Sequence, residues 1–260
     1  MKEKIKAEAA KLGLDCCGIA NQDGKSIIVC LFPYYIYEIK GNISKYAMIS
    51  DYHLVCKKYL YDLMINLEID DFDVYVDISP YDERKLAYKA GLGVIGKNRL
   101  LINNKYGSYV FIGLVVLNSI KLEADSPLNK ACLNCGNCIK KCPGKALEEN
   151  GFIKEKCLSD ITQKKGKLSE IEKNLIIKTG MVWGCDECSQ ACPMNKKILE
   201  TPIPEFKKNI ISSLYLKDFE GLSNKEFKEK YKNRAFTWRG RNVLIRNCGV
   251  LEGCLPEDKL

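Results

Sequence analysis

Two cysteine-rich runs constrain this chain more than any other feature. The first reads Cys132-Leu-Asn-Cys135-Gly-Asn-Cys138-Ile-Lys-Lys-Cys142-Pro143, and the second reads Cys185-Asp-Glu-Cys188-Ser-Gln-Ala-Cys192-Pro193. The first has the spacing C-x2-C-x2-C-x3-C-P, which is typical of segments that hold two [4Fe–4S] clusters. Three closely spaced thiolates wrap one cubane, and the fourth, followed by proline, ligates the other cluster. The runs therefore predict a two-cluster segment.

Because the fourth ligands are exchanged, each cluster takes cysteines from both runs. We expect the first cluster to be held by Cys132, Cys135, Cys138 and Cys192. We expect the second to be held by Cys142, Cys185, Cys188 and one further thiolate. Cys157 is the best candidate for this eighth ligand because it lies in the connector between the runs. The remaining cysteines lie outside the segment: Cys16, Cys17, Cys30, Cys56, Cys248 and Cys254.

A pair of zinc knuckles and a disulfide framework are the alternatives for these runs. Zinc sites favour four ligands in C-x2-C pairs and do not require the x3-C-P tail. The N-terminal segment is charged and has no apolar signal region, and no apolar stretch approaches the ~18 residues of a membrane span. We therefore expect a cytoplasmic protein without a membrane segment, whose reduced thiols are available to metal.

Size and charge set wide bounds. The chain has 260 residues, of which 46% are hydrophobic, enough for one or two domains with a substantial core. The net charge of +8 permits a polyanionic partner. A basic enzyme without such a partner is equally compatible with this charge.

The segment before Cys132 alternates between helical and strand patterns. We expect helices over residues 2–12, 54–67 and 82–90, and strands over residues 26–32, 72–77, 100–102 and 109–117. Residues 158–178 are polar and partly helical in pattern, and the chain after Pro193 is lysine-rich and weakly helical.

Two residues of the N-terminal half are candidates for proton chemistry. Asp77 ends the strand at 72–77, and α/β sheets tend to place ligands at the carboxyl ends of strands. It could equally be a turn-forming aspartate. His53 is the one histidine of the chain, and although a lone histidine is more often structural, this side chain titrates closest to neutrality.

The run Gly91-Leu-Gly93-Val-Ile-Gly96-Lys97-Asn98 resembles a nucleotide-binding loop but lacks its setting. Both G-x-G-x-x-G and the P-loop need a strand before the run and a helix after it. Here a helix is predicted before it and a strand after it, and Asn98 stands where a P-loop needs Ser or Thr. We reject NAD and ATP binding and expect a Gly-rich turn that either lets backbone approach a large ligand or is a tight connection.

A basic stretch near the C-terminus could bind RNA. Four arginines are interleaved with two aromatic residues, and such a pattern can meet phosphates and bases: Arg234, Phe236, Trp238, Arg239, Arg241 and Arg246. A solvated helix face is the alternative.

Taken together, the chain resembles the epoxyqueuosine reductases, cobalamin-dependent iron–sulfur enzymes of queuosine biosynthesis that are related to the reductive dehalogenases. The resemblance covers nearly the whole chain. Beside both cysteine runs, it rests on Gly41-Asn-Ile-Ser-Lys-Tyr46-Ala, Asp51-Tyr-His53, Val76-Asp77, Glu83-Arg84, Ala90-Gly-Leu-Gly93, Gly96-Lys-Asn98, Gly107-Ser108, Cys157-Leu-Ser159, Gly184-Cys-Asp-Glu-Cys188, Cys192-Pro-Met-Asn195 and Arg246-Asn247.

The resemblance implies an α+β fold with an N-terminal α/β domain over residues 1–125 that binds cobalamin without its lower axial base. A ferredoxin-like domain with two [4Fe–4S] clusters would follow over residues 126–200, and a short helical, basic segment over residues 201–260. The implied reaction is reduction of epoxyqueuosine to queuosine at the wobble position of tRNA.

The resemblance also implies roles for single residues. Asp77 maps onto the acid that protonates the leaving oxygen, and burial would have to raise its pKa above the ordinary ~3.9 for that role. The expected cofactor-binding residues are Tyr46, Asp77, Gly96, Asn98, Ser159, Asp186 and Glu187. The expected partners are a tRNA anticodon stem-loop and an external low-potential electron donor, with the protein a monomer.

The sequence ends at Leu260, whereas full-length family members usually continue into a helical-repeat domain that grips tRNA. We therefore expect weaker binding of whole tRNA. Two alternatives remain: a cobalamin-dependent reductase of a small molecule, similar to the reductive dehalogenases, and a two-cluster electron-transfer protein. A two-cluster electron-transfer protein would not require the long segment before Cys132.

Overall fold

The computed structural model describes residues 1–37 and 39–253, so Cys254 lies outside the described residues. The chain forms two compact units, each assembled from three segments. The first unit comprises Met1–Tyr35, Tyr52–Cys135 and Pro193–Lys207, and the second comprises Ile36–Asp51, Gly136–Cys192 and Lys208–Leu260. The sequence predicted three domains that follow one another along the chain, over residues 1–125, 126–200 and 201–260. That division into functional domains stays a prediction.

The first unit is built on an antiparallel sheet. Its strands are β1 (Cys17–Gln22), β2 (Lys25–Pro33), β3 (Phe72–Val76) and β6 (Val110–Leu117), in the order β1-β2-β6-β3. Asp23 and Gly24, both with positive φ, form the two-residue hairpin turn between β1 and β2. The predicted strands at 26–32, 72–77 and 109–117 are confirmed, whereas β1 was not predicted.

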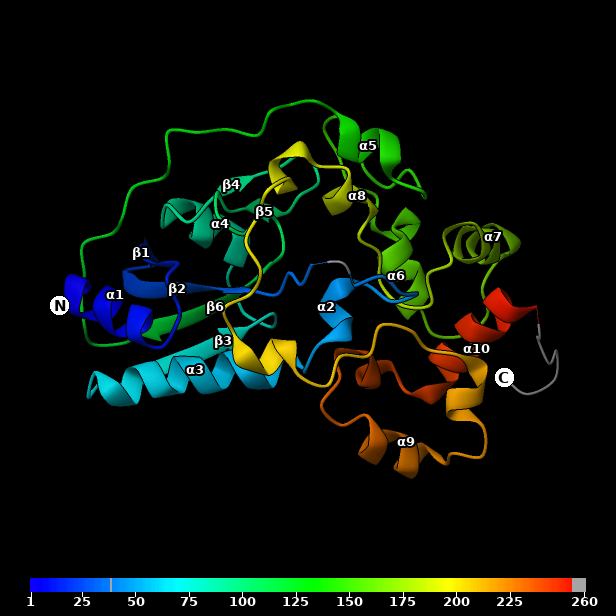
Figure 1. Ribbon diagram of the computed structural model, residues 1–260. Helices are drawn as coiled ribbons and strands as arrows, with labels where there is room; N and C mark the ends of the chain where they lie inside the picture. Colours follow the sequence, from blue (N-terminus) through cyan, green and yellow to red (C-terminus); the bar gives the residue numbers. More distant parts are fainter. Residues whose placement is uncertain (38, 254–260) are drawn as a thin grey trace. The chain divides into compact units, whose positions relative to one another are not determined.

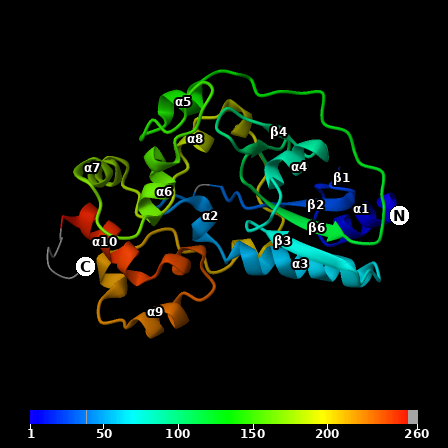
Figure 2. The same cartoon turned by 180° about the vertical axis from the view of Figure 1, so that it is seen from behind.

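Helices cover both faces of this sheet, which explains why β2 is buried along nearly its whole length. On one face, Ile27, Val29 and Leu31 pack with residues of α4 (Glu83–Lys89). On the other face, α1 (Lys2–Lys11) contacts β1, and α3 (Tyr52–Asn66) contacts β3 and β6 (Figures 1 and 2). All three helices were predicted, and their apolar sides complete a core on each side of the sheet.

A short hairpin of β4 (Val94–Ile95) and β5 (Leu101–Ile102) follows α4. The Gly-rich run from Gly91 to Asn98 therefore has a helix before it and leads through a hairpin. This is the reverse of the strand-loop-helix order of a dinucleotide or P-loop site, as the sequence indicated.

The second unit is mainly helical. Its α-helices are α2 (Lys45–Met48), α5 (Asn137–Lys141), α6 (Leu158–Gln163), α7 (Glu170–Thr179), α8 (Glu187–Gln190), α9 (Asn224–Lys230) and α10 (Arg241–Glu252). Fully buried Trp183 belongs to a core cluster of this unit, together with residues of α2, α9 and α10. A smaller cluster joins α6, α7 and α10. None of the helices that the structure describes is long and apolar enough to cross a lipid bilayer.

The predicted RNA-facing stretch lies mostly inside this unit. Phe236 is fully buried, and Arg246 is only 4% exposed because its guanidinium donates hydrogen bonds to the carbonyls of Lys164 and Gly166. Arg234 donates to the carbonyl of Met48. The prediction that all four arginines and both aromatics face RNA is therefore wrong. Charge pattern alone cannot distinguish a solvated arginine from one that binds backbone carbonyls.

Candidate active site and cluster ligands

Asp77 lies directly after β3, at a strained position of the backbone. Its φ is 66°, in the left-handed region that non-glycine residues rarely adopt. The amide of Ile78 donates to the carbonyl of Val76 at 2.8 Å, so Asp77 is the central residue of a γ-turn with positive φ. Such strained residues persist where the surrounding structure holds them, and they cluster at functional sites.

Two side chains from the first turn of α3 hold the carboxylate of Asp77. The hydroxyl of Tyr52 donates to Asp77 Oδ2 at 3.0 Å, and His53 Nε2 lies 3.4 Å from the same oxygen. Hydrogen bonding from His53, assisted by Tyr52, lowers the pKa of Asp77 despite partial desolvation. The acid role would need burial to raise the pKa of Asp77 above its ordinary value; desolvation acts in that direction, but the hydrogen bonds outweigh it and the pKa is lowered. The carboxyl is 60% exposed and is an ionised group beside the chain's one histidine.

A column of stacked rings fixes this pair of donors. His53 stacks on Tyr52 with ring centroids 4.1 Å apart, and Tyr52 stacks on Phe111 of β6 at 4.0 Å. Phe111 in turn stacks on Tyr34 at 4.3 Å. The ring column ties the start of α3 to the sheet, so that Tyr52 and His53 stay close to the turn at Asp77.

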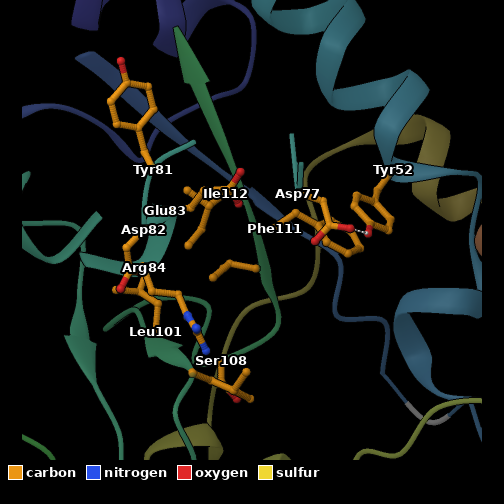
Figure 3. A pocket seen from close by; sticks show the side chains of 12 residues that line it. Tyr52, Asp77, Tyr81, Asp82, Glu83, Arg84, Leu101, Ser108, Phe111 and Ile112 are labelled. Atoms are coloured by element: carbon orange, nitrogen blue, oxygen red, sulfur yellow. Dashed lines mark hydrogen bonds between the residues drawn. The ribbon is translucent and has the colours of Figure 1, made fainter. Parts of the chain in front are cut away.

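Asp77 opens onto a cavity of about 390 Å³ within the first unit (Figure 3). Its lining combines carboxylates, an arginine, hydroxyls and apolar side chains: Tyr52, Asp77, Tyr81, Asp82, Glu83, Arg84, Leu100, Leu101, Ser108, Val110, Phe111 and Ile112. Burial, and then the charge of Asp77, raise the pKa of Glu83 to about 7. A cavity with convergent polar groups and carboxyls whose pKa values are pushed apart is a candidate active site.

Ser108 of this cavity is positioned by Asn195. The amide of Ser108 donates to Asn195 Oδ1 at 2.8 Å, and Asn195 Nδ2 donates to the Ser108 hydroxyl at 2.7 Å. The segments Gly107-Ser108 and Cys192-Pro-Met-Asn195, which both contributed to the family resemblance, therefore meet through these two hydrogen bonds. The sequence alone did not pair them.

Gly96 and Asn98 form a second polar feature of the first unit. A Cβ at position 96 would lie 2.4 Å from Asn98 Oδ1, so glycine is needed for this close approach. Asn98 is 6% exposed, and its Nδ2 is buried with no hydrogen-bond partner among the described residues. A buried donor without a partner fits a site for a polar ligand, because an unmet buried amide is costly. Both residues were expected to contact the cofactor.

Four of the other expected cofactor contacts belong to the second unit. Gln163 donates from Nε2 to the Tyr46 hydroxyl at 3.3 Å and to the Ser159 carbonyl at 2.9 Å, so it brings Tyr46 and Ser159 together. Gly184 has no room for a side chain, since a Cβ would lie 2.5 Å from Ser44 Cβ and 3.0 Å from Tyr46 Cε1. Gln163 was not singled out in the sequence, because its role depends on where α6 packs.

Asp186 is buried, and its carboxylate accepts hydrogen bonds at the start of α2. Its carboxylate accepts a hydrogen bond from the Ser44 hydroxyl at 2.6 Å and another from the Lys45 amide at 2.7 Å. Ser44 is the N-cap residue of α2, so Asp186 satisfies helix-end donors that would otherwise be unpaired. Glu187, the fourth expected contact, is partly exposed and begins α8.

The second unit brings together the four thiols expected to hold the second cluster. Cys188 interacts electrostatically with Cys157 and Cys142, and Cys185 interacts with Cys188 and Cys157. Cys157 also interacts with Cys142. This grouping includes Cys157, the residue chosen from the sequence as the eighth ligand, and it supports that choice.

The helices that follow the C-x2-C pairs also meet. α5 carries Cys138, α8 carries Cys188, and the two helices pack against each other. In residues 1–37 and 39–253, no three cysteine, histidine or acidic side chains converge on the position of a single metal ion. A cubane offers a separate iron to each thiolate, so its ligands need not converge on one point.

Comparisons with known proteins agree over both units. Residues 20–78 match the family model described as epoxyqueuosine reductase QueG, DUF1730. Residues 131–195 match a 4Fe-4S double cluster binding domain. This second match covers all eight cysteines expected to ligate the clusters.

Curated relatives and solved structures carry the same description. An epoxyqueuosine reductase from Leadbetterella byssophila is 30% identical over 96% of this chain and 98% of its own length. One from Lactococcus garvieae is 37% identical over 80% of this chain, but the match spans only 60% of that protein. The solved enzyme from Streptococcus thermophilus superposes with a TM-score of 0.82 at 26% identity, over 99% of this chain and 82% of its own.

A further solved structure is that of an epoxyqueuosine reductase with a tRNA-Tyr epoxyqueuosine-modified tRNA stem loop. It matches with a TM-score of 0.84 and 25% identity, covering 97% of this chain and 81% of that chain. The chain thus matches the solved structures over most of their length, although it spans little more than half of several curated relatives, such as 55% of the Staphylococcus aureus protein.

Proposed function

The chain belongs to the epoxyqueuosine reductase family, and from this premise we propose that it reduces epoxyqueuosine to queuosine at the wobble position of tRNA. The observation that carries the proposal is the Asp77 carboxylate, held by Tyr52 and His53 at the edge of a cavity. A related enzyme has been solved with an epoxyqueuosine-modified stem loop, which supports the same substrate class here.

The reaction sets the requirements of the site. Converting an epoxide to an alkene breaks two carbon–oxygen bonds, forms one carbon–carbon π bond and releases water. It consumes two electrons and two protons. The site must therefore combine a source of low-potential electrons with a group that delivers protons to the leaving oxygen.

We propose that the electrons come from an external low-potential donor and pass through two [4Fe–4S] clusters. Cys132, Cys135, Cys138 and Cys192 would hold the first cluster, and Cys142, Cys157, Cys185 and Cys188 the second. Thiolates in these spacings are the ligand set that such clusters require. The electrostatic grouping of the second set supports this assignment.

Cobalamin, when bound base-off, supplies a low-valent cobalt centre that can reduce the epoxide-bearing ring. The residues present fit such a group. The unpaired amide of Asn98 beside Gly96 offers a donor for a polar substituent. Tyr46 and Ser159, joined by Gln163, and the segment of Asp186 and Glu187 would provide further contacts.

Asp77 would direct a proton to the epoxide oxygen. Tyr52 and His53 both donate to its carboxylate, so its free oxygen lone pairs are oriented by two fixed partners. At neutral pH the imidazole of His53 is the side chain of this pair that readily exchanges protons with water. We infer that the pair is loaded through His53 and that Asp77 passes the proton on, a contribution of ~10²–10⁴-fold for a general acid.

The exposed face of the C-terminal segment supports contact with RNA. Trp238 is 62% exposed, and the guanidinium of Arg239 lies 3.7 Å from its ring centroid. A stacked aromatic and guanidinium pair suits an unpaired base of an anticodon loop. We propose this pair, rather than the whole arginine stretch, as a contact for the stem-loop, in a cytoplasmic tRNA-modifying enzyme.

The proposal is tested with anaerobically purified protein reconstituted with iron, sulfide and cobalamin. Metal and sulfide analysis should give two [4Fe–4S] clusters and one cobalt per chain. With a low-potential reductant, the loaded protein should convert epoxyqueuosine in tRNA to queuosine, separated and identified as nucleosides by mass spectrometry. No turnover by fully loaded protein would favour a small-molecule reductase, and failure to bind any corrinoid would favour a two-cluster electron carrier.

A further inference from the structure

Two cysteines outside the expected cluster ligands face each other across the hairpin of the first unit. Cys17 begins β1, and Cys30 of β2 is its direct partner in the antiparallel register. Side chains of directly paired residues project from the same face of a sheet and lie close together. The thiols of Cys17 and Cys30 are therefore neighbours on one face.

The pair occupies the closer of the two kinds of site in an antiparallel ladder. The amide of Leu31 donates to the carbonyl of Cys16 at 2.9 Å, so these two residues form a hydrogen-bonded pair. Because hydrogen-bonded and non-hydrogen-bonded pairs alternate, the adjacent pair of Cys17 and Cys30 is non-hydrogen-bonded. Such pairs bring Cα atoms to about 4.5 Å. Disulfides join Cα atoms about 4.4–6.8 Å apart, so the register permits a bond here.

The surroundings of Cys30 leave Cys17 as its cross-strand neighbour. The residues on either side of Cys30, Val29 and Leu31, pack with α4 on one face of the sheet. Cys30 therefore points to the opposite face. Its direct partner on β6 is Gly113, which has no side chain. Of its two direct partners, Cys17 is thus the one that brings a side chain to Cys30.

The two thiols differ in their access to solvent. Both are free thiols, and Cys17 is partly exposed whereas Cys30 is fully buried. The neighbouring Cys17, and then burial, raise the pKa of the Cys30 thiol above its ordinary value. Because the thiolate is the reactive form, a small reagent reacts first at Cys17, and Cys30 then reacts with the modified Cys17 sulfur.

We propose that Cys17 and Cys30 form a redox-active dithiol, which low-molecular-weight disulfides convert into a reversible cross-strand disulfide. In the first step the Cys17 thiolate attacks one sulfur of the small disulfide, forms a mixed disulfide and releases one small thiolate. In the second step Cys30 loses its proton and attacks the Cys17 sulfur, which releases the other small thiolate. The protein gives up two electrons and two protons, and the small disulfide becomes two thiols.

The geometry of the site predicts a disulfide that is easily reduced again. A Cα separation of about 4.5 Å lies at the short end of the disulfide range, whose usual value is about 5.5–6 Å. Departure from the usual geometry strains a disulfide and makes it more reducible. Since β1 is an edge strand of the sheet, the bond would tie this edge to β2 in a reversible way.

Cys16 is a matched control because it adjoins Cys17 in sequence but lies on the other face of the sheet. It packs against the cluster of residues on the α4 side, and Asn103 Nδ2 lies 3.7 Å from its Sγ. A reaction governed only by position in the sequence would treat Cys16 and Cys17 alike, whereas a reaction governed by the register would select Cys17.

The test treats anaerobic, cluster-loaded native protein with 2-hydroxyethyl disulfide, blocks the remaining thiols and maps tryptic peptides without reduction by mass spectrometry. Lys25 lies between the two cysteines, so trypsin places them on separate peptides that a disulfide joins. In the wild type we expect loss of about two free thiols per chain, a peptide linking Cys17 to Cys30, and unchanged iron content. Excess 2-mercaptoethanol should restore both thiols.

Serine variants separate the expected pair from other linkages. Cys16→Ser should form the same cross-link as the wild type, whereas Cys17→Ser should lose it and leave Cys30 as a free thiol. A link from Cys30 to any other cysteine, a mixed disulfide at Cys17 that does not proceed to the cross-link, or no reaction in native protein would overturn the proposal. A cross-link that resists excess 2-mercaptoethanol would overturn its reversibility. Because the mapping needs neither cobalamin nor tRNA, its result is independent of the proposed function.

Discussion

Nε2 of His53 lies 3.4 Å from Oδ2 of Asp77, although the two residues belong to different parts of the fold. His53 comes from the first turn of α3, and Asp77 follows β3. Because the histidine lowers the pKa of the aspartate, the two side chains act as one proton-handling pair rather than as an isolated acid.

Replacing Asp77 with Asn should remove this pair's proton delivery while keeping its shape. Asn is nearly isosteric and tolerates positive φ. We expect both clusters and cobalamin to be retained and turnover of epoxyqueuosine tRNA to fall on the order of 10²-fold or more. Nucleoside analysis of anaerobic reactions measures the loss. Equal turnover in variant and wild type would remove Asp77 from the mechanism.

Replacing His53 with Gln keeps a nitrogen donor near Asp77 Oδ2 but removes the titrating imidazole. We expect turnover to fall by less than in Asp77→Asn, and we expect one limb of the pH–rate profile near neutrality to disappear. The profile should be recorded in single turnover with pre-reduced protein. A His53→Gln profile that parallels the wild type would show that His53 does not load the proton.

Replacing Cys157 with Ala should degrade one cluster. The Cys157 thiol interacts electrostatically with three other cysteines of the second unit, so its removal would leave a cubane with three ligands. Iron analysis after full reconstitution should fall toward half of the wild-type content. Cys56→Ala is the control, since Cys56 is a buried cysteine of α3 that lies outside this group. Full iron content in Cys157→Ala would exclude it as a ligand.

Glu83 should make the protein less stable as pH rises toward neutrality. Its pKa is raised from an ordinary 4.5 to about 7, so the folded state binds a proton that the unfolded state releases earlier. This contribution is complete below about pH 4.5 and is lost as pH rises through 7. Chemical denaturation of Glu83→Gln between these pH values should show a smaller decline in unfolding free energy than the wild type.

Replacing Trp238 with Ala should weaken binding of a tRNA anticodon stem-loop by about 1–3 kcal/mol if a base stacks on the indole. Fluorescence anisotropy at fixed salt measures the change. Ile171→Ala is a matched control, because Ile171 is 77% exposed in α7 of the same unit. Equal binding by Trp238→Ala and the wild type would place the RNA elsewhere.

The sequence predicted the elements whose pattern is local. β2 and β6 are long apolar runs, and α3 and α4 have helical periodicity, so these were found within a few residues. β1 was missed because Cys17–Gln22 is short and ends in polar residues, and its strand form depends on pairing with β2. The sheet is antiparallel, so the rule that places ligands at the ends of parallel strands does not explain Asp77.

The candidate site was only partly predictable for a related reason. Asp77 and the cysteines follow motifs, and Cys157 follows from counting ligands. Glu83 looks like an ordinary acidic residue in a first helical turn, and the raised pKa of its carboxyl depends on burial beside Asp77, which the sequence does not reveal. The same limit explains Arg246, whose guanidinium binds carbonyls from a loop that is distant in sequence.

The discontinuous second unit has a consequence for anyone who wishes to isolate its iron–sulfur segment. Trp183 lies between the cysteine runs, and its buried neighbours include Ile43 from far upstream and Leu244 from α10 far downstream. Asn247 Nδ2 also donates to the carbonyls of Thr162 and Val182. A fragment limited to residues 126–200 would expose this indole and leave these carbonyls unmet. We therefore expect that the cluster segment does not fold by itself, and that moving it into another protein would require both flanking segments.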